Sequence, residues 1–187
     1  MLKGKLVELC QIEESDLAKF RDWRNSSFVR NYVREYRPLN MQNQKQWFES
    51  LTNDRSNIMF AIHGIVIGET IGGCGLTYIN WKEGHGEVSI CLGDTEWQGK
   101  GYAGEALDIL IKYGFEELRL HRICAIIYSY NELSIKLFEK HGFHFEGLQR
   151  EARFWNGKFH DEKIYGILDY EYKERVGKEK YGIQNSK

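Results

Sequence analysis

The chain has 187 residues and a nearly balanced charge, with 26 Lys and Arg residues against 27 Asp and Glu residues. This length predicts one domain with a sizeable core, and the charge balance predicts neither a nucleic-acid partner nor an anionic membrane surface as partner. No apolar run approaches the ~20 residues of a membrane span, and the first residues lack the apolar core of a signal peptide. The four cysteines stand apart without a C-x-x-C pair, which predicts reduced thiols, no metal site and a cytoplasmic location.

The first half of the sequence predicts two helices among several strands. Residues 5–10 form the expected first strand, and Ser15 is the expected N-cap of the first helix. Pro38, the only proline, marks a turn before the second helix. The strands expected after that helix lie at residues 58–62, 65–67, 73–79 and 86–92.

The second half predicts helices that alternate with strands. An apolar stripe beginning at Tyr102 predicts a helix, and Asn156-Gly157 is a hairpin turn signal between two long strands. The remaining elements are expected at residues 123–128, 131–141, 143–154 and 159–168. We therefore expect one α/β domain at residues 1–172, followed by a charged, solvated C-terminal tail at residues 173–187.

The most informative segment is the glycine-rich loop between the strand at 86–92 and the following helix. Its three glycines permit backbone conformations that a Cβ would forbid, and they leave N–H groups bare at a helix N-terminus. Such a terminus binds a phosphate or pyrophosphate group. The expected phosphate-binding residues are Gln98, Gly99, Lys100, Gly101, Tyr102, Ala103 and Gly104.

Two interpretations of this loop compete. Residues 99–104 fit the G-x-G-x-x-G pattern of dinucleotide-binding folds, whereas residues 98–103 read Gln-x-x-Gly-x-Ala. A dinucleotide fold places its loop after the first strand and an acid at the end of the next one, but here that strand ends Ile127-Tyr128-Ser129. A P-loop is excluded because Lys100 is followed by Gly101 rather than Ser or Thr. The loop's late position in the chain disfavours a dinucleotide-binding oxidoreductase.

Several segments around the loop occur in a characteristic order and spacing. They are Gln98 to Ala103, Tyr113-Gly114-Phe115-Glu116-Glu117-Leu118, Asn131-Glu132-Leu133-Ser134, Leu137 to Phe143, and Asn156 to Asp161. Over roughly residues 85–172 this set resembles the RimJ/RimL-like branch of the GNAT N-acetyltransferases. The resemblance implies an α/β GNAT fold, with a mixed, mostly antiparallel sheet, a splayed parallel strand pair and flanking helices. It also implies acetyl-CoA as donor without a metal, while the N-terminal third, which usually carries the acceptor pocket, matches only loosely.

The resemblance further implies that acetyl-CoA enters between the strands at 86–92 and 123–129. A backbone N–H near Cys91 and Leu92 would polarise the thioester carbonyl, as an oxyanion-hole donor does. Asn131 would bond the pantetheine chain in addition to capping its helix. Because Cys91 is interpreted as an ordinary strand residue, the transfer is expected to be direct, through a ternary complex.

The chemistry also needs a base and an acid. Alternation along the strand places Glu87, Ser89 and Cys91 on one face, so Glu87 is the candidate base, acting directly or through a water. A structural carboxylate at a strand start explains Glu87 equally well. The resemblance assigns the acid to Ser134, with water as the alternative, because Phe138 occupies the position of a tyrosine found in some branches.

The hypothesis that follows is acetyl transfer from acetyl-CoA to a primary amine, either a protein N-terminus or a small molecule. The balanced charge predicts no extended acidic groove and so disfavours a polyamine. Arg34, Glu35 and Arg37 reach the acceptor if the first two helices form one wall. A catalytically silent acyl-CoA sensor is the alternative of a different class, ahead of the oxidoreductase. The C-terminal strands are the candidate surface for a homodimer.

Overall fold

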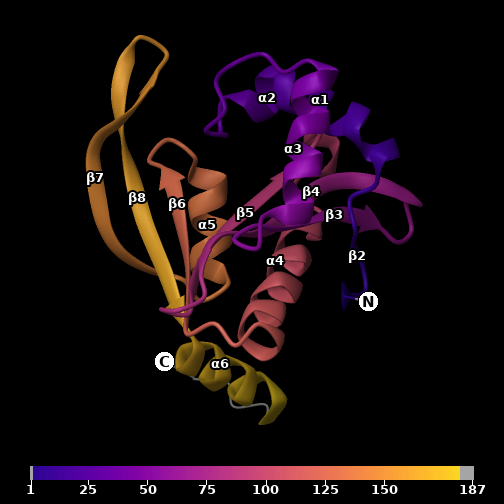
Figure 1. Cartoon of the computed structure of the whole chain (residues 1–187). Coiled ribbons are helices and arrows are strands. Elements are labelled where there is room, and N and C mark those ends of the chain that lie inside the picture. Colours follow the sequence, from indigo (N-terminus) through magenta and orange to yellow (C-terminus); the bar gives the residue numbers. More distant parts are fainter. Residues whose placement is uncertain (1, 182–187) are drawn as a thin grey trace.

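A computed structural model describes residues 2–181, whose centre is one twisted sheet (Figure 1). The sheet has eight strands in the order β1-β2-β3-β4-β5-β6-β8-β7. Its strands are β1 (Leu2–Lys3), β2 (Val7–Cys10), β3 (Ile58–Gly64), β4 (Glu69–Asn80), β5 (His85–Leu92), β6 (Arg122–Tyr128), β7 (His144–Trp155) and β8 (Lys158–Leu168). Neighbouring strands pair antiparallel except β5 and β6, which are parallel. The expected mixed, mostly antiparallel α/β sheet is confirmed.

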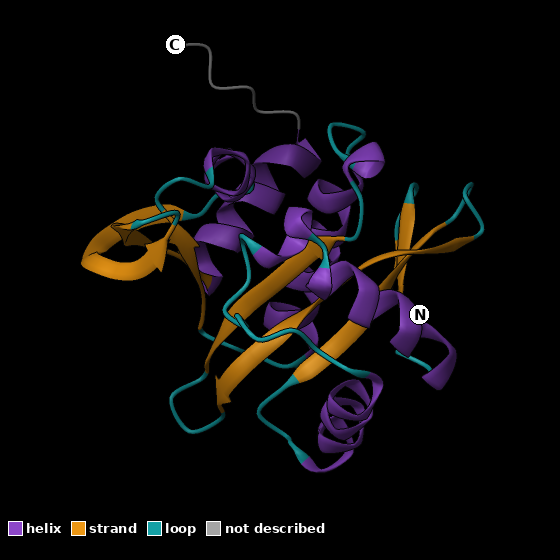
Figure 2. Cartoon of the chain, turned by 90° about the horizontal axis from the view of Figure 1, so that it is seen from above, coloured by secondary structure: helices purple, strands orange, loops and turns teal. Residues whose placement is uncertain are grey.

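Helices cover both faces of this sheet (Figure 2). They are α1 (Leu17–Asn25), α2 (Ser27–Arg30), α3 (Met41–Asn53), α4 (Tyr102–Lys112), α5 (Glu132–Lys140) and α6 (Asp169–Tyr181). On β3, Ala61 packs in the apolar cluster formed with α1 and α3, whereas the adjacent Ile62 packs in the larger cluster that contains α4. Because successive strand residues face opposite sides, α1 and α3 lie on one face and α4 on the other. No helix within residues 2–181 is both long and apolar enough to cross a membrane.

The parallel pair β5–β6 opens along its length. The two strands pair only at His85↔Arg122, Gly86↔Ile123 and Glu87↔Cys124. Beyond that point β5 stays on β4 as far as Leu92, and β6 stays on β8 as far as Tyr128. The edges of β5 and β6 that face each other therefore lack a strand partner, and the predicted splayed pair is confirmed.

Two local predictions in the N-terminal half were wrong. Ser15 does not cap the first helix, because it lies within a short 3₁₀ turn (Glu14–Asp16) that Glu13 and Asp16 cap reciprocally. Residues 65–67 form the turn between β3 and β4 rather than a strand. Their β-branched side chains suggested a strand, but the N–H of Ile65 donates to the carbonyl of Leu6 at 2.9 Å, outside the β3–β4 ladder.

The residues expected as a solvated tail begin inside helix α6. Tyr172 is 5% exposed, and its hydroxyl donates to Glu116 at 2.7 Å. Arg175 donates to Asp108 at 3.0 Å and to the carbonyl of His141 at 2.7 Å. The division predicted at residue 172 thus falls within a packed helix, and residues 182–187 of the predicted tail lie outside the described residues.

Candidate functional site

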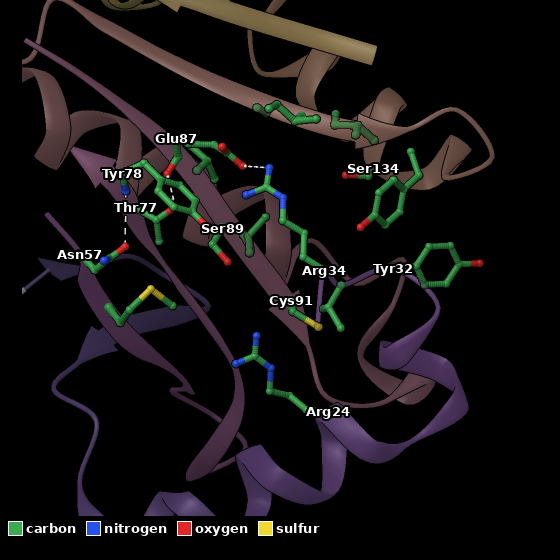
Figure 3. A pocket seen from close by; sticks show the side chains of 18 of the residues that line it. Arg24, Tyr32, Arg34, Asn57, Thr77, Tyr78, Glu87, Ser89, Cys91 and Ser134 are labelled. Carbon is green, nitrogen blue, oxygen red and sulfur yellow. Dashed lines mark hydrogen bonds and ion pairs between the residues drawn. The ribbon is translucent and has the colours of Figure 1, made fainter. Parts of the chain in front are cut away.

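The gap between β5 and β6 opens into a cleft of about 410 Å³ (Figure 3). One wall consists of β5, β6 and the start of α5, and the opposite wall consists of α1, α3 and the segment between α2 and α3. Of the predicted site residues, Glu87, Cys91, Asn131 and Ser134 line this cleft. The glycine-rich loop does not line it, but follows β5 at the end where the two strands have diverged.

Glu87 lies where β5 and β6 stop pairing, and its side chain is only 14% exposed. Nη2 of Arg34 donates to Oε1 of Glu87 at 2.6 Å, across the cleft mouth from the segment after α2 (Figure 3). Burial raises the pKa of the Glu87 carboxyl, the guanidinium of Arg34 opposes this shift, and the charge of Glu162 adds to it. A carboxylate with a raised pKa is a stronger proton acceptor than an exposed one.

The hydrogen-bond ladder of β5 determines which backbone groups face the gap. The N–H of Gly93 donates to the carbonyl of Ile71 at 2.9 Å, in the same register that pairs Cys91 with Gly73. Because hydrogen-bonded pairs alternate along an antiparallel ladder, the N–H of Cys91 faces β4. The N–H groups of Ile90 and Leu92 face the β6 side. Cys91 itself therefore offers only its side chain to the cleft.

The environment of the Cys91 thiol disfavours its thiolate form. Burial raises its pKa to about 11, and the positive charge of Arg24 opposes that rise. A thiol with this pKa stays protonated near neutral pH, whereas the thiolate is the reactive form. Direct transfer without an acyl-enzyme agrees with this protonation state.

Asn131 and Ser134 lie together at the start of α5, on the wall opposite α1 and α3. The Asn131 side-chain oxygen accepts the backbone N–H of Ser134 at 3.2 Å, so the expected N-cap is confirmed. Phe138, one turn further along α5, also lines the cleft and offers no hydroxyl. Ser134 is thus the residue of α5 in this cleft that carries a side-chain O–H donor.

The glycine-rich loop leads from β5 through a 3₁₀ turn (Thr95–Trp97) to the N-terminus of α4. Gly99 and Gly101 have φ values of 71° and 88°, in the left-handed region that favours glycine. Gly101 is the N-cap, and no side chain caps the helix. The first intrahelical bond here runs from the N–H of Glu105 to the carbonyl of Gly101 at 3.0 Å. The N–H groups of the first helical residues, 102–104, therefore have no intrahelical acceptor and can bind an anion.

The match to known proteins agrees with this geometry. A family model described as an acetyltransferase (GNAT) domain matches residues 7–144. The chain belongs to the GNAT acetyltransferase family. The dinucleotide-binding interpretation of the loop is thereby excluded.

Several relatives of this GNAT chain match it over most of their length. The uncharacterized N-acetyltransferase YoaA of Bacillus subtilis (strain 168) is 30% identical over 175 residues, 90% of this chain and 96% of that protein. Spermidine N(1)-acetyltransferase of Escherichia coli (strain K12) is 28% identical over 166 residues, 89% of this chain and 88% of that protein. Spermidine N-acetyltransferase from Vibrio cholerae, solved with CoA and spermine, superposes with a TM-score of 0.84 at 26% identity. That match covers 90% of this chain and 99% of the Vibrio chain, and a dodecameric structure of the same enzyme gives a TM-score of 0.80.

These matches establish a GNAT acyltransferase that depends on acetyl-CoA. They show the family without singling out its RimJ/RimL-like branch, and they leave the acceptor amine undecided. Among the side chains of residues 2–177, no group of three or more His, Cys, Asp or Glu could hold a metal ion.

The sequence analysis did not identify the carboxylate of Glu105, which holds the end of the glycine-rich loop in place. The side chain of Glu105, in the first turn of α4, accepts the backbone N–H groups of Lys5, Leu6 and Val7 at 2.8, 2.6 and 2.8 Å. These three bonds attach the start of β2 to the N-terminus of α4. An acid in the first helical turn is a known sequence signal, but its usual partner is the helix itself rather than a segment a hundred residues away.

The cleft wall of α1, α3 and the segment between α2 and α3 was also largely missed. Arg34 was named as a candidate, and it lines the cleft, whereas Glu35 and Arg37 bind each other at 2.8 Å. Arg24 was not singled out, although it lines the cleft from α1. The guanidinium carbon of Arg34 lies 5.6 Å from the centroid of the Tyr78 ring. Tyr78 has a φ of 51° and lies at a β-bulge in β4. Neither a bulge nor an inward-pointing arginine leaves a local sequence signal.

Proposed function

We propose that this protein transfers the acetyl group of acetyl-CoA directly to a primary amine held in the cleft between β5 and β6. The observation that carries the proposal is the largely buried Glu87 carboxylate, paired with Arg34 where the two strands diverge. A base at this point can deprotonate an amine that faces the thioester. The phosphates of acetyl-CoA would bind the N-terminus of α4 and the glycine-rich loop, residues 98–104.

The base matters because the acceptor must lose a proton before it can attack. An alkylamine with a pKa of about 10.4 costs roughly 4.6 kcal/mol to deprotonate at pH 7, and a protein N-terminus with a pKa near 8 costs ~1.4 kcal/mol. Glu87 takes this proton, directly or through a water. Its raised pKa makes the transfer more favourable than it would be for an exposed carboxylate.

The remaining steps use groups on β5 and α5. The amine nitrogen attacks the thioester carbon, and the N–H groups of Ile90 and Leu92 stabilise the oxyanion that forms. The C–S bond then breaks, and the Ser134 hydroxyl donates a proton to the leaving thiolate. Asn131 holds the start of α5, and its amide nitrogen is free to bond the pantetheine chain.

For the acceptor, we propose a protein N-terminal amine or a small-molecule amine, which is the range of the RimJ/RimL-like branch. The spermidine N-acetyltransferases of Escherichia coli and Vibrio cholerae make polyamines the competing candidate class. We also propose a cytoplasmic location and a homodimer. The four unpaired cysteines support the first, and the oligomeric Vibrio relative supports self-association.

A catalytically silent acyl-CoA sensor is distinguished by measuring CoA thiol release with a panel of primary amines. We expect amine-dependent release by the wild-type protein, and a large loss for Glu87→Gln with acetyl-CoA binding preserved. If acetyl-CoA binds but no amine gives release above background hydrolysis, the sensor is favoured and our proposal is wrong.

A further inference from the structure

The charged groups that line the cleft are unequally neutralised. They are two arginines, Arg24 and Arg34, and two carboxylates, Asp54 and Glu87. Glu87 is paired with Arg34 at 2.6 Å. Asp54 accepts the backbone N–H and the hydroxyl of Ser56 at 2.8 and 2.6 Å, so it closes the turn after α3. Both carboxylates are thus engaged by local partners.

Arg24 is the arginine of the cleft that has no carboxylate partner among the described side chains. Within residues 2–177 it has no ion pair, and its guanidinium lies 6.0 Å from the centroid of the Trp47 ring. Glu35 is close enough for the charge of Arg24 to contribute to its lowered pKa, but its two oxygens bind Arg37 at 2.9 and 2.8 Å. An arginine head with donors to spare is suited to a carboxylate.

The position of the Arg24 guanidinium is set by helix α1, which carries it, and by the Trp47 ring beneath it. Its side chain leaves α1 and points across the cleft toward Cys91 on β5 (Figure 3). The Trp47 ring beneath it packs on Phe20 at a centroid distance of 6.2 Å, and Phe20 is 8% exposed. The guanidinium is therefore presented to the cleft by a packed aromatic pair rather than by a mobile surface stem.

Arg24 and Glu87 occupy different stretches of the same cleft. Cys91, whose thiol pKa responds to the charge of Arg24, is four positions beyond Glu87 on the strand (Figure 3). Four strand residues span about 13 Å. An amine at Glu87 can therefore belong to a molecule whose second polar group, several bonds away, meets the Arg24 guanidinium.

We propose that Arg24 binds a carboxylate of the acceptor, so that the preferred acceptor is a primary amine carrying a carboxylate several bonds from its nitrogen. This inference rests on the proposed amine acetylation and specifies its acceptor. A diamine of the same length would place an ammonium beside an unpaired guanidinium, and like charges disfavour such a complex. An acceptor of this class would differ from the spermidine for which the Escherichia coli and Vibrio cholerae relatives are named.

The test uses three amines of matched length, 6-aminohexanoate, hexylamine and 1,6-diaminohexane, with the full-length protein and acetyl-CoA. We expect kcat/KM to be highest for 6-aminohexanoate and lowest for the diamine, by at least tenfold between them. Arg24→Gln should reduce that ratio at least tenfold. Arg21→Gln, on the same helix but paired with Asp22 outside the cleft, should leave the ratio unchanged.

Calorimetric binding to the protein–CoA complex separates failure of the inference from failure of the reaction. If no amine is acetylated, the proposed function fails, and a wild-type preference for 6-aminohexanoate that Arg24→Gln removes would still support the carboxylate site. A preference for the diamine, or a carboxylate preference that survives in Arg24→Gln, overturns the inference. So does a variant that loses CoA affinity with its acceptor preference intact, because Arg24 would then serve the donor.

Discussion

The two walls of the cleft differ in what shapes them, backbone geometry in one and side chains in the other. The wall of β5, β6 and the start of α5 depends on backbone geometry, in the splay beyond Glu87 and in the loop that continues from β5, with left-handed glycines at 99 and 101. The wall of α1, α3 and the segment between α2 and α3 acts through side chains such as Arg24 and Arg34. Backbone geometry is shared by any sequence with this fold, so we propose that the first wall binds the acyl donor. We propose that individual side chains of the second wall select the amine.

The largest effect should come from Glu87, which stands where the two walls meet. Glu87→Gln keeps the size and much of the polarity but removes the proton acceptor, so we expect kcat to fall about 10²- to 10⁴-fold. The Kd for acetyl-CoA should change less than twofold, measured by calorimetry. Glu83→Gln, an exposed carboxylate in the turn before β5, is the control. Equal kcat for wild type and Glu87→Gln would reduce Glu87 to a structural role.

A smaller loss should follow from removing the hydroxyl of the α5 wall. Ser134→Ala should lower kcat roughly 10- to 100-fold, because the thiolate then leaves without a positioned proton donor. Ser134→Thr retains a hydroxyl and should recover part of the rate. If Ser134→Ala turns over at the wild-type rate at all pH values, water is the acid.

The proposed role of the glycine-rich loop in binding the acyl donor is tested by two glycines with similar torsions. Gly101→Ala and Gly68→Ala both place a Cβ at a positive φ, 88° and 77°, and each should cost about 1–2 kcal/mol of folding free energy. Only Gly101→Ala should also weaken acetyl-CoA binding, about tenfold, because its Cβ would lie 3.3 Å from Leu6 and disturb the anion site. Denaturation and calorimetry on both variants separate the effects. Equal acetyl-CoA affinity in both would remove the loop from the donor site.

The smallest effect is expected from removing the helix N-cap on each wall of the cleft. Asn131→Ala and Asn40→Ala each remove a side-chain oxygen that accepts a backbone N–H, at 3.2 Å from Ser134 and 2.9 Å from Asn43. Each should lower stability by about 1 kcal/mol, or the Tm by roughly 2–4 °C. Asn131→Ala should also raise the Kd for acetyl-CoA a few-fold, whereas Asn40→Ala should not. The reverse pattern would place the donor against α3.

The sequence predicted the elements of the β5–β6 wall better than the side chains of the α1–α3 wall, for a physical reason. Glycines at 99 and 101, the alternation at Glu87 and the cap at Asn131 are short-range patterns that the backbone itself imposes. Arg24 reaches the cleft because α1 packs on the sheet through Phe20, a contact that no local pattern records. The hydrogen bond that the Glu105 carboxylate accepts from the start of β2 is likewise long-range. Helix α6 was missed because its charged exposed face outweighed its few buried residues in the pattern.

The central claim is that Glu87, held by Arg34, is the base, and the pH dependence of kcat tests it most directly. The charge and hydrogen bond of Arg34 lower the pKa of Glu87, so Arg34→Gln should raise that pKa. Because only the ionised carboxylate accepts a proton, the acid limb of kcat should move to higher pH in Arg34→Gln than in wild type, at saturating acetyl-CoA and amine. An acid limb that stays in place or moves to lower pH would contradict the account.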